Sequence, residues 1–116
     1  MNSKSSISKL FVVIAVASAA LASSFAYAMD DSEVEALMRK NGCFKCHAVD
    51  KTKKGPSYKK VAAKYKGKAD GEEKLIKNFT TGPKVKLEDG TEEDHKIIDT
   101  KDAKELKNLA QWILSQ

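Results

Sequence analysis

The sequence predicts a small all-α domain built from about four short helices. Four segments carry apolar residues at helical spacing, and they are bounded by residues that cap or end helices. The 116-residue chain also begins with an export leader, so the folded part is a single domain too small to bury a large core of its own. A Cys-x-x-Cys-His run follows soon after the leader and suggests how such a small core is completed.

The first 28 residues have the pattern of a secretory signal peptide. Lys4 and Lys9 give a positive n-region, residues 10–21 form an apolar run, and Ala26-Tyr27-Ala28 matches a cleavage site. The apolar run is too short to span a bilayer comfortably. We therefore expect cleavage after Ala28 and a periplasmic domain of residues 29–116. The alternative is a leader that is retained as a membrane anchor.

The first two helices are predicted on either side of the Cys-x-x-Cys-His run. Ser32 and Glu35 form a capping box that starts a helix running to about Asn41, and Gly42 ends that helix. A lysine-rich loop over residues 48–56 follows. Ser57 then begins a second helix, which Gly67 stops.

The last two helices flank a region without helical spacing, residues 80–99. Asp70 is expected to cap a third helix whose apolar face includes Leu75 and Phe79. The final helix is expected to start at Thr100 or Asp102, and its apolar residues are Leu106, Leu109, Ala110, Trp112 and Ile113. In the region between them, Asp89-Gly90 predicts a hairpin turn, with Val85 and Leu87 before it and Ile97 and Ile98 after it.

Residues 43–47 read Cys-Phe-Lys-Cys-His, which is the attachment signature of c-type haem. Two thiols at i and i+3 lie on one side of a helical turn, where each can add to a haem vinyl group. His47 is then held where it can bind the iron as proximal ligand. We therefore expect one haem c bound covalently through Cys43 and Cys46, with the helices packed around it.

Two other readings of this run are less favoured. A thioredoxin-like redox pair would need a surrounding strand–helix–strand pattern, which the sequence lacks. A zinc site would use Cys43, Cys46, His47 and His95 as a formal Cys2His2 set. Adjacent Cys46 and His47 would bind one small tetrahedral ion awkwardly, so haem is preferred.

Three segments of this chain resemble the class I cytochromes c, in particular the small bacterial cytochrome c-551 (cytochrome c8) group. They are residues 42–48, GCFKCHA; residues 55–65, GPSYKKVAAKY; and residues 109–116, LAQWILSQ. The resemblance implies the fold of that class, with the first and last helices crossing near the haem at Gly42 and Trp112. It also implies that the carbonyl of Pro56 accepts a hydrogen bond from His47 and orients the imidazole.

The chain departs from that family at the sixth iron ligand. The family uses a methionine in the loop before the last helix, whereas the three methionines here are Met1, Met29 and Met38. Met38 is expected to be a core residue of the first helix. The loop instead contains His95 and Lys96. Neutral imidazole is a good iron ligand, whereas Lys96 must first lose a proton. His95 is therefore favoured over a water-bound or open site, and Lys96 is the least favoured.

The charges favour a protein partner over nucleic acid. Without the leader, basic residues exceed acidic residues by three, a small excess for a nucleic-acid-binding protein. A cluster of lysines surrounds the haem motif: Lys45, Lys51, Lys53, Lys54, Lys59 and Lys60. A basic ring at the haem edge would steer redox proteins with acidic surfaces. We expect contact with the membrane only through transient docking to respiratory complexes.

Two functions are compatible with these residues. The first is a periplasmic one-electron carrier with His/His ligation and a potential lower than that of relatives with a methionine ligand. No nucleophile–base or acid pair is recognisable, so no enzyme is predicted. The alternative is a gas-binding or sensing haem protein whose sixth site is open or only loosely held by His95.

Overall fold

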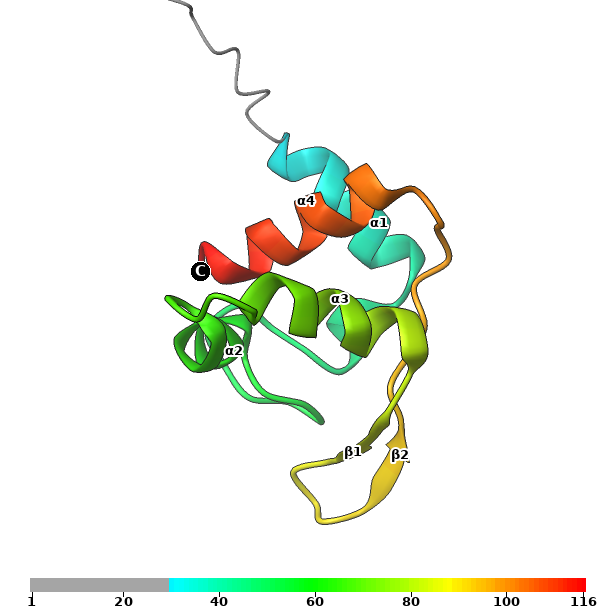
Figure 1. The fold of residues 1–116 in the computed structure, drawn as a ribbon. Coiled ribbons are helices and arrows are strands. Elements are labelled where there is room, and N and C mark those ends of the chain that lie inside the picture. The colour runs from blue at the N-terminus through cyan, green and yellow to red at the C-terminus, as the bar shows by residue number, and fades with distance from the viewer. Residues whose placement is uncertain (1–29) are drawn as a thin grey trace, which may run out of the picture.

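The computed structural model describes residues 30–116 and shows four α-helices with one small hairpin sheet (Figure 1). The predicted leader lies outside these residues. The elements in chain order are α1 (Asp31–Lys40), the short 3-10 helix η1 (Cys43–Lys45), α2 (Tyr58–Tyr65), α3 (Gly71–Thr81), β1 (Lys84–Lys86), β2 (Glu92–Asp94) and α4 (Ala103–Leu114). The predicted all-α class with four short helices is confirmed, and the small hairpin sheet is an addition to it. Within residues 30–116, no helix is long and apolar enough to cross a membrane.

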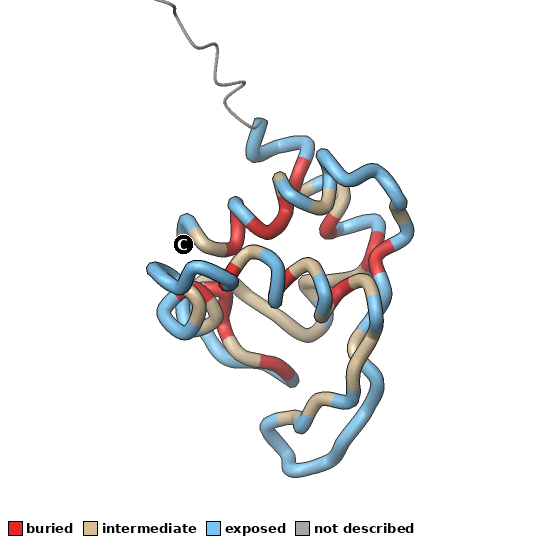
Figure 2. The backbone as a smooth tube through the Cα atoms, in the orientation of Figure 1, coloured by how far each residue is buried: buried red, intermediate tan, exposed pale blue. Residues whose placement is uncertain are grey.

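Helix α4 is the centre of the packing, because it contacts α1, α2 and α3. It crosses α1 at the top of the view in Figure 1. Figure 2 shows the buried parts of the helices turned toward one another around a common interior. The buried apolar side chains are Val34 and Met38 of α1, Tyr58 and Ala62 of α2, Leu75 and Phe79 of α3, Ile98, and Leu109, Ala110, Trp112 and Ile113 of α4. Met38 is fully buried, which confirms it as a core residue.

The N-terminus of α1 differs from the sequence prediction. The cap is Asp30, whose carboxylate accepts hydrogen bonds from the Ser32 backbone N–H (2.9 Å) and hydroxyl (2.7 Å). Ser32 therefore lies inside the first turn, and the predicted capping box of Ser32 and Glu35 is wrong. An aspartate two residues earlier competes for the same orphan backbone donor and brings a favourable charge to the helix N-terminus.

The other helix starts are closer to prediction. Ser57 caps α2 by accepting from the Lys60 N–H at 3.1 Å, and Asp102 caps α4 by accepting from the Lys104 N–H at 2.8 Å. Asp70 precedes α3 as expected but makes no side-chain cap bond. Its carboxylate instead forms an ion pair with Lys74 one turn later, at 2.9 Å.

The predicted hairpin turn is present, but its second strand is shorter than expected. β1 and β2 pair antiparallel with Val85 opposite Glu93, and Gly90 in the turn has φ +86°. Ile97 and Ile98 lie beyond β2, where the chain leaves the sheet and hydrogen-bonds to α3 instead: the Ile98 N–H donates to the Phe79 carbonyl at 2.8 Å. The apolar pair thus returns to the helical core, with Ile98 buried.

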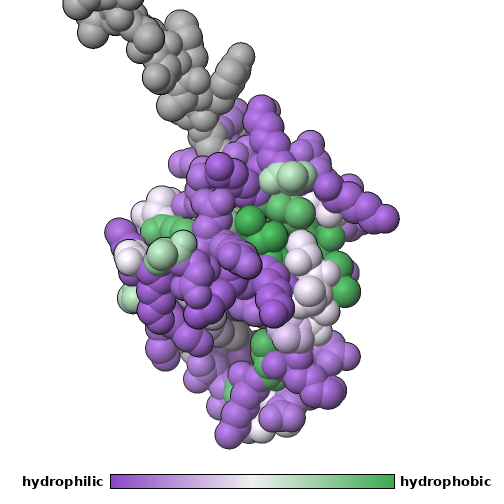
Figure 3. All heavy atoms as spheres, viewed as in Figure 1, coloured by the Kyte–Doolittle hydropathy of each residue, from purple (hydrophilic) through white to green (hydrophobic). Residues whose placement is uncertain are grey.

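The surface in Figure 3 is mostly hydrophilic, with hydrophobic atoms gathered between α3 and the beginning of α4. An open groove lies among these segments, lined by Thr80, Ile97, Ile98, Asp99, Thr100, Lys101 and Leu106. A cavity larger than this groove lies beside the Cys-x-x-Cys-His run.

Candidate haem site

A cavity of about 790 Å³ lies beside η1, with walls from α2, α3, α4 and the hairpin. Its lining is largely apolar and includes Val61, Tyr65, Leu75, Phe79, Val85, Leu87, Ile98, Leu109 and Ile113, together with the sulfur and imidazole groups of Cys43, Cys46, His47 and His95. The structure therefore brings four of the predicted site residues to one apolar cavity, although His95 is about fifty positions from the others in the sequence.

The two cysteines lie on one helical turn, as their spacing predicts. The Cys46 N–H donates to the Cys43 carbonyl at 3.2 Å, and the His47 N–H donates to the same carbonyl at 3.0 Å. Both thiols are half-buried, and they do not form a disulfide with each other. Burial raises the pKa of the Cys43 thiol. Gly42, which precedes this turn, has φ +68°, a backbone conformation that favours glycine.

Helices α1 and α4 are in contact, whereas the role of Gly42 at their crossing stays a prediction. A Cβ at this position would lie nearest to the Lys45 side chain, at 3.5 Å, and among its three nearest atoms none belongs to Trp112. The positive φ by itself favours a glycine here. Trp112 is buried in α4, and its ring meets that of Tyr58 edge to face at 5.5 Å between centroids.

The imidazole of His47 is held from two sides. Its Nδ1 lies 2.7 Å from the carbonyl oxygen of Pro56, the contact expected from the family resemblance. A carbonyl can only accept, so Nδ1 carries the proton and Nε2 has the free lone pair. The ring also stacks on Tyr58, with 5.0 Å between centroids and 29° between planes. Burial lowers the pKa of His47 and so favours the neutral, ligating form.

His95 faces His47 across the cavity. The two ring centroids are 6.3 Å apart and their planes are inclined by 44°. Nδ1 of His95 lies 2.9 Å from the carbonyl oxygen of Lys96, so by the same reasoning its Nε2 has the free lone pair. His95 is half-buried, whereas Lys96 is exposed. Both imidazoles thus carry the backbone hydrogen bond that usually orients a metal-bound histidine.

The spacing of the two imidazoles agrees with one metal ion between them. With bonds of about 2 Å from each nitrogen to the metal, two imidazoles on opposite sides place their centroids roughly 6 Å apart. The geometry is less suitable for a zinc ion alone. In residues 30–116, no group of three or more His, Cys, Asp or Glu side chains could hold a metal ion. An apolar cavity with two thiols and two imidazoles fits a haem.

Tyr58 and Gly55 are site residues that sequence reasoning did not single out. Tyr58 is 4% exposed and contacts His47, Trp112 and Phe44 through its ring. A Cβ on Gly55 would lie 2.8 Å from Cε1 of His47, which is too close. The sequence did hold a clue to both residues, because they lie next to or two positions from Pro56. Residues this close to the carbonyl that orients His47 must pack around the same imidazole.

Comparisons with known proteins show the family. Residues 31–116 match the model of the cytochrome c family. The chain belongs to the cytochrome c family. It is 35% identical over 82 residues to cytochrome c-551 of Pseudomonas aeruginosa, covering 71% of this chain and 75% of the relative. With cytochrome c-552 of Hydrogenobacter thermophilus it shares 35% identity over 81 residues, covering 70% of this chain and 79% of the relative.

Solved structures give the same result. The class 1 cytochrome MtoD from Sideroxydans lithotrophicus ES-1 is 57% identical, with a TM-score of 0.72 over 76% of this chain and 97% of its own. Cytochrome c552 of Nitrosomonas europaea is 30% identical, with a TM-score of 0.55 over 70% of this chain and 96% of its own. The cytochrome therefore has the class I fold and one covalently bound haem c, and it is a haem-based electron carrier.

Replacing Gly55 by alanine should disturb the imidazole of His47 specifically. The added Cβ would meet Cε1 at 2.8 Å and Nδ1 at 3.2 Å, so the ring must move away from Pro56. We expect Gly55→Ala to lower the free energy of unfolding by about 1–3 kcal/mol and to shift the visible spectrum and the NMR signals of the His47 ring. Thermal unfolding and both spectra check this.

Gly67→Ala is the matched control. Gly67 has φ +78°, but nothing lies within 4 Å of a Cβ there. This variant should lose a similar free energy through backbone strain alone and keep wild-type His47 signals. If Gly55→Ala also leaves those signals unchanged, the close approach does not position the imidazole.

Proposed function

We propose that this cytochrome is a periplasmic one-electron carrier with bis-histidine ligation. Cys43 and Cys46 would hold the haem, while His47 and His95 would bind the iron from opposite faces. The observation that carries the proposal is the pair of imidazoles facing each other across the apolar cavity, with centroids 6.3 Å apart. The leader predicted for residues 1–28 supports export.

His95 is the better distal ligand on three grounds. Its ring is half-buried and lines the cavity, and its Nδ1 is already engaged by a backbone carbonyl. Lys96 also borders the cavity, but it is exposed, and its ammonium group must lose a proton before it can bind iron.

Haem supplies the one-electron chemistry when bound, and the chain's own residues hold its surroundings fixed. Pro56 and Tyr58 orient His47, and the carbonyl of Lys96 orients His95. Held in this way, the two imidazoles would keep their positions when the protein gains or loses an electron. Two imidazoles also favour the oxidised iron more than a histidine–methionine pair, so we propose a lower potential than in relatives with methionine. No enzymatic role is proposed.

Redox proteins would dock at the lysine-rich edge of the cavity. The six lysines predicted to ring the haem motif are all exposed. Lys60 borders the cavity, and Lys45 lies against Gly42 at its rim. The cavity lining also includes Lys64, Lys86 and Lys96 with Glu93 and Asp94, which leaves a positive balance. Such a balance attracts acidic partners and speeds a brief encounter.

The ligand assignment is tested by His95→Ala. Removing this imidazole should leave haem attached and His47 bound, and it should open one face of the iron. We expect a high-spin spectrum and CO binding to the reduced protein at least about tenfold faster than in wild type, a change equivalent to about 1.4 kcal/mol. Absorption spectroscopy and stopped-flow mixing with CO measure both effects.

Lys96→Ala serves as the matched control, since it removes the neighbouring side chain but not the imidazole. It should keep the wild-type spectrum and CO kinetics. A wild-type spectrum in His95→Ala combined with a changed one in Lys96→Ala would assign the ligand to Lys96. Rapid CO binding by the wild-type protein would instead favour the gas-binding function.

His95→Met tests the proposed potential. A thioether in place of the imidazole favours the reduced iron, so the midpoint potential should rise by on the order of 0.1 V, a fraction of the roughly 0.8 V range that axial ligands span. A spectroelectrochemical titration of both proteins measures it. An unchanged potential in a variant that still has six ligands would show that the ligand pair does not set the value.

The lysine-rich edge is tested with small charged redox reagents. Lys45→Glu and Lys60→Glu should each slow oxidation of the reduced protein by ferricyanide roughly threefold at low ionic strength, and should speed oxidation by a cationic cobalt complex. These differences should vanish near 1 M salt, where the Debye length is about 3 Å. Lys107→Glu on α4 makes the same change in net charge away from the cavity lining and should have little effect.

A further inference from the structure

The segment that carries His95 has no helix or strand of its own. Residues 95–99, called here the ligand segment, run from the end of β2 toward α4. Backbone hydrogen bonds join it to the chain just before the hairpin: the His95 N–H donates to the Pro83 carbonyl at 2.9 Å, and the Ile98 N–H donates to the Phe79 carbonyl at 2.8 Å. These bonds fix the ligand segment to α3 and to the turn after it.

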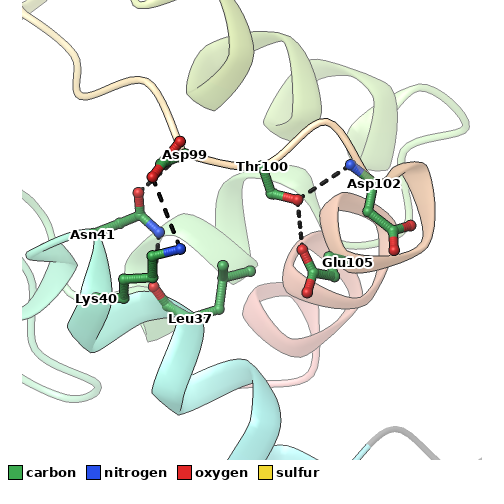
Figure 4. Close-up of polar contacts among 7 residues, drawn as sticks. All are labelled: Leu37, Lys40, Asn41, Asp99, Thr100, Asp102 and Glu105. Carbon is green, nitrogen blue, oxygen red and sulfur yellow. Dashed lines mark hydrogen bonds and ion pairs between the residues drawn. The ribbon is translucent and has the colours of Figure 1, made fainter.

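A third hydrogen bond fixes the ligand segment to a distant part of the chain. The Asp99 N–H donates to Oδ1 of Asn41 at 2.7 Å, across 58 positions of sequence. Figure 4 shows Asn41 at the end of α1, with its side chain pointing at the backbone of Asp99. Lys40 also approaches the Asp99 carboxylate at 3.8 Å, but both side chains are exposed. Such an exposed ion pair contributes little to stability.

The amide of Asn41 is buried and uses both ends. The residue is 5% exposed, and its Nδ2 donates to the Leu37 carbonyl at 2.9 Å. The amide NH2 therefore donates to a carbonyl of α1, while the amide oxygen accepts from the ligand segment. Asn41 also lies two residues before Cys43. It thus joins the element that attaches the haem to the segment that presents His95.

We propose that Asn41 is a positioning residue for the distal ligand. Through the Asp99 N–H it holds the end of the ligand segment in place, so that His95 stays bound and resists displacement. This inference rests on the proposed ligation by His95. This hydrogen bond is part-buried, because its acceptor lies on Asn41, which is 5% exposed, whereas its donor lies on Asp99, which is exposed. Removing the Asn41 amide takes away this direct contact between α1 and the ligand segment, and with it the net stabilisation that an intramolecular hydrogen bond contributes. Without it, the ligand segment keeps its two backbone hydrogen bonds, to Pro83 and to Phe79 of α3, and loses the one at its Asp99 end.

The test separates this role from a general effect on stability. Asn41→Ala removes both hydrogen bonds of the amide. Asn41→Asp retains an oxygen that can accept from the Asp99 N–H but loses the donor to Leu37, and it places a negative charge at a helix C-terminus, which is unfavourable. Both variants should therefore unfold more easily, yet only the alanine variant should loosen the ligand segment.

The measurements are made on the holoprotein. CO binding to the reduced form reports how readily His95 leaves the iron, and amide hydrogen exchange reports the protection of the Ile98 and Asp99 N–H groups. In Asn41→Ala we expect CO binding about tenfold faster than in wild type, equivalent to about 1.4 kcal/mol, and faster exchange at both amides. Asn41→Asp should stay within about twofold of wild type in both measurements, a difference of less than half that energy.

Two further variants serve as controls. Val34→Ala weakens α1 at a buried apolar position that does not border the haem cavity, and it should leave CO kinetics unchanged. In a His95→Ala background, Asn41→Ala should have no additional effect on CO binding, since the ligand it positions is gone. If Asn41→Ala does not fold, Asn41→Ser takes its place, because a serine hydroxyl is too short to span the same contact.

The outcomes are distinct. An unchanged CO rate in Asn41→Ala, an equal increase in Val34→Ala, or an equal increase in Asn41→Asp would each overturn the positioning role of Asn41 and leave the ligation by His95 standing. If His95→Ala alone has no effect on the spectrum or on CO binding, the ligand assignment itself is wrong, and the role of Asn41 is overturned with it.

Discussion

The hydrogen bond between Nδ1 of His47 and the Pro56 carbonyl is the contact on which the rest of the site depends. It closes a loop that begins at the cysteine turn, and it fixes which nitrogen of the imidazole faces the cavity. Gly55 must lack a side chain for this loop to close against the ring. Gly55 and Pro56 therefore act together: Gly55 leaves room for the imidazole, and the Pro56 carbonyl accepts its hydrogen bond.

The same imidazole is also where the site meets the core. Tyr58 stacks on His47 and contacts Trp112 of α4, which in turn belongs to the helix that contacts α1, α2 and α3. A shift of His47 would have to move a buried tyrosine and the central helix with it. A chain this small has little apolar surface to bury. Because His47 packs against the core, the same contacts stabilise the fold and hold the imidazole in position.

The sequence predicted the helices and the proximal half of the site well, because those signals are local. Ser57 and Asp102 cap the helices expected of them, and residues 43–47 and Pro56 lie within one short stretch. The errors arose where two local signals compete, as at Ser32, where the nearby Asp30 provides the cap instead.

The distal half was harder to predict, because its geometry comes from contacts between distant segments. A lone histidine after three acidic residues has the pattern of a solvated loop, and it became a ligand candidate only because the family's methionine is absent. What brings it to the cavity is the hairpin and the bond from Asp99 to Asn41, which spans 58 positions. No periodicity or spacing in the sequence encodes that bond.

The two halves of the site are thus held in different ways, and this bears on the choice between the two functions. His47 is fixed by a hydrogen bond to Pro56, nine positions further along the chain, and by the aromatic core. His95 lies on a segment without secondary structure, fixed by backbone bonds on one side and by one buried amide on the other.

A loosely held distal histidine would yield to small ligands and suit a gas-binding protein. A segment fixed at both ends instead favours a ligand that stays bound through each change of oxidation state, which is what an electron carrier requires. Under the proposed ligation, the buried Asn41 amide is therefore as much a determinant of function as the histidine that it helps to place.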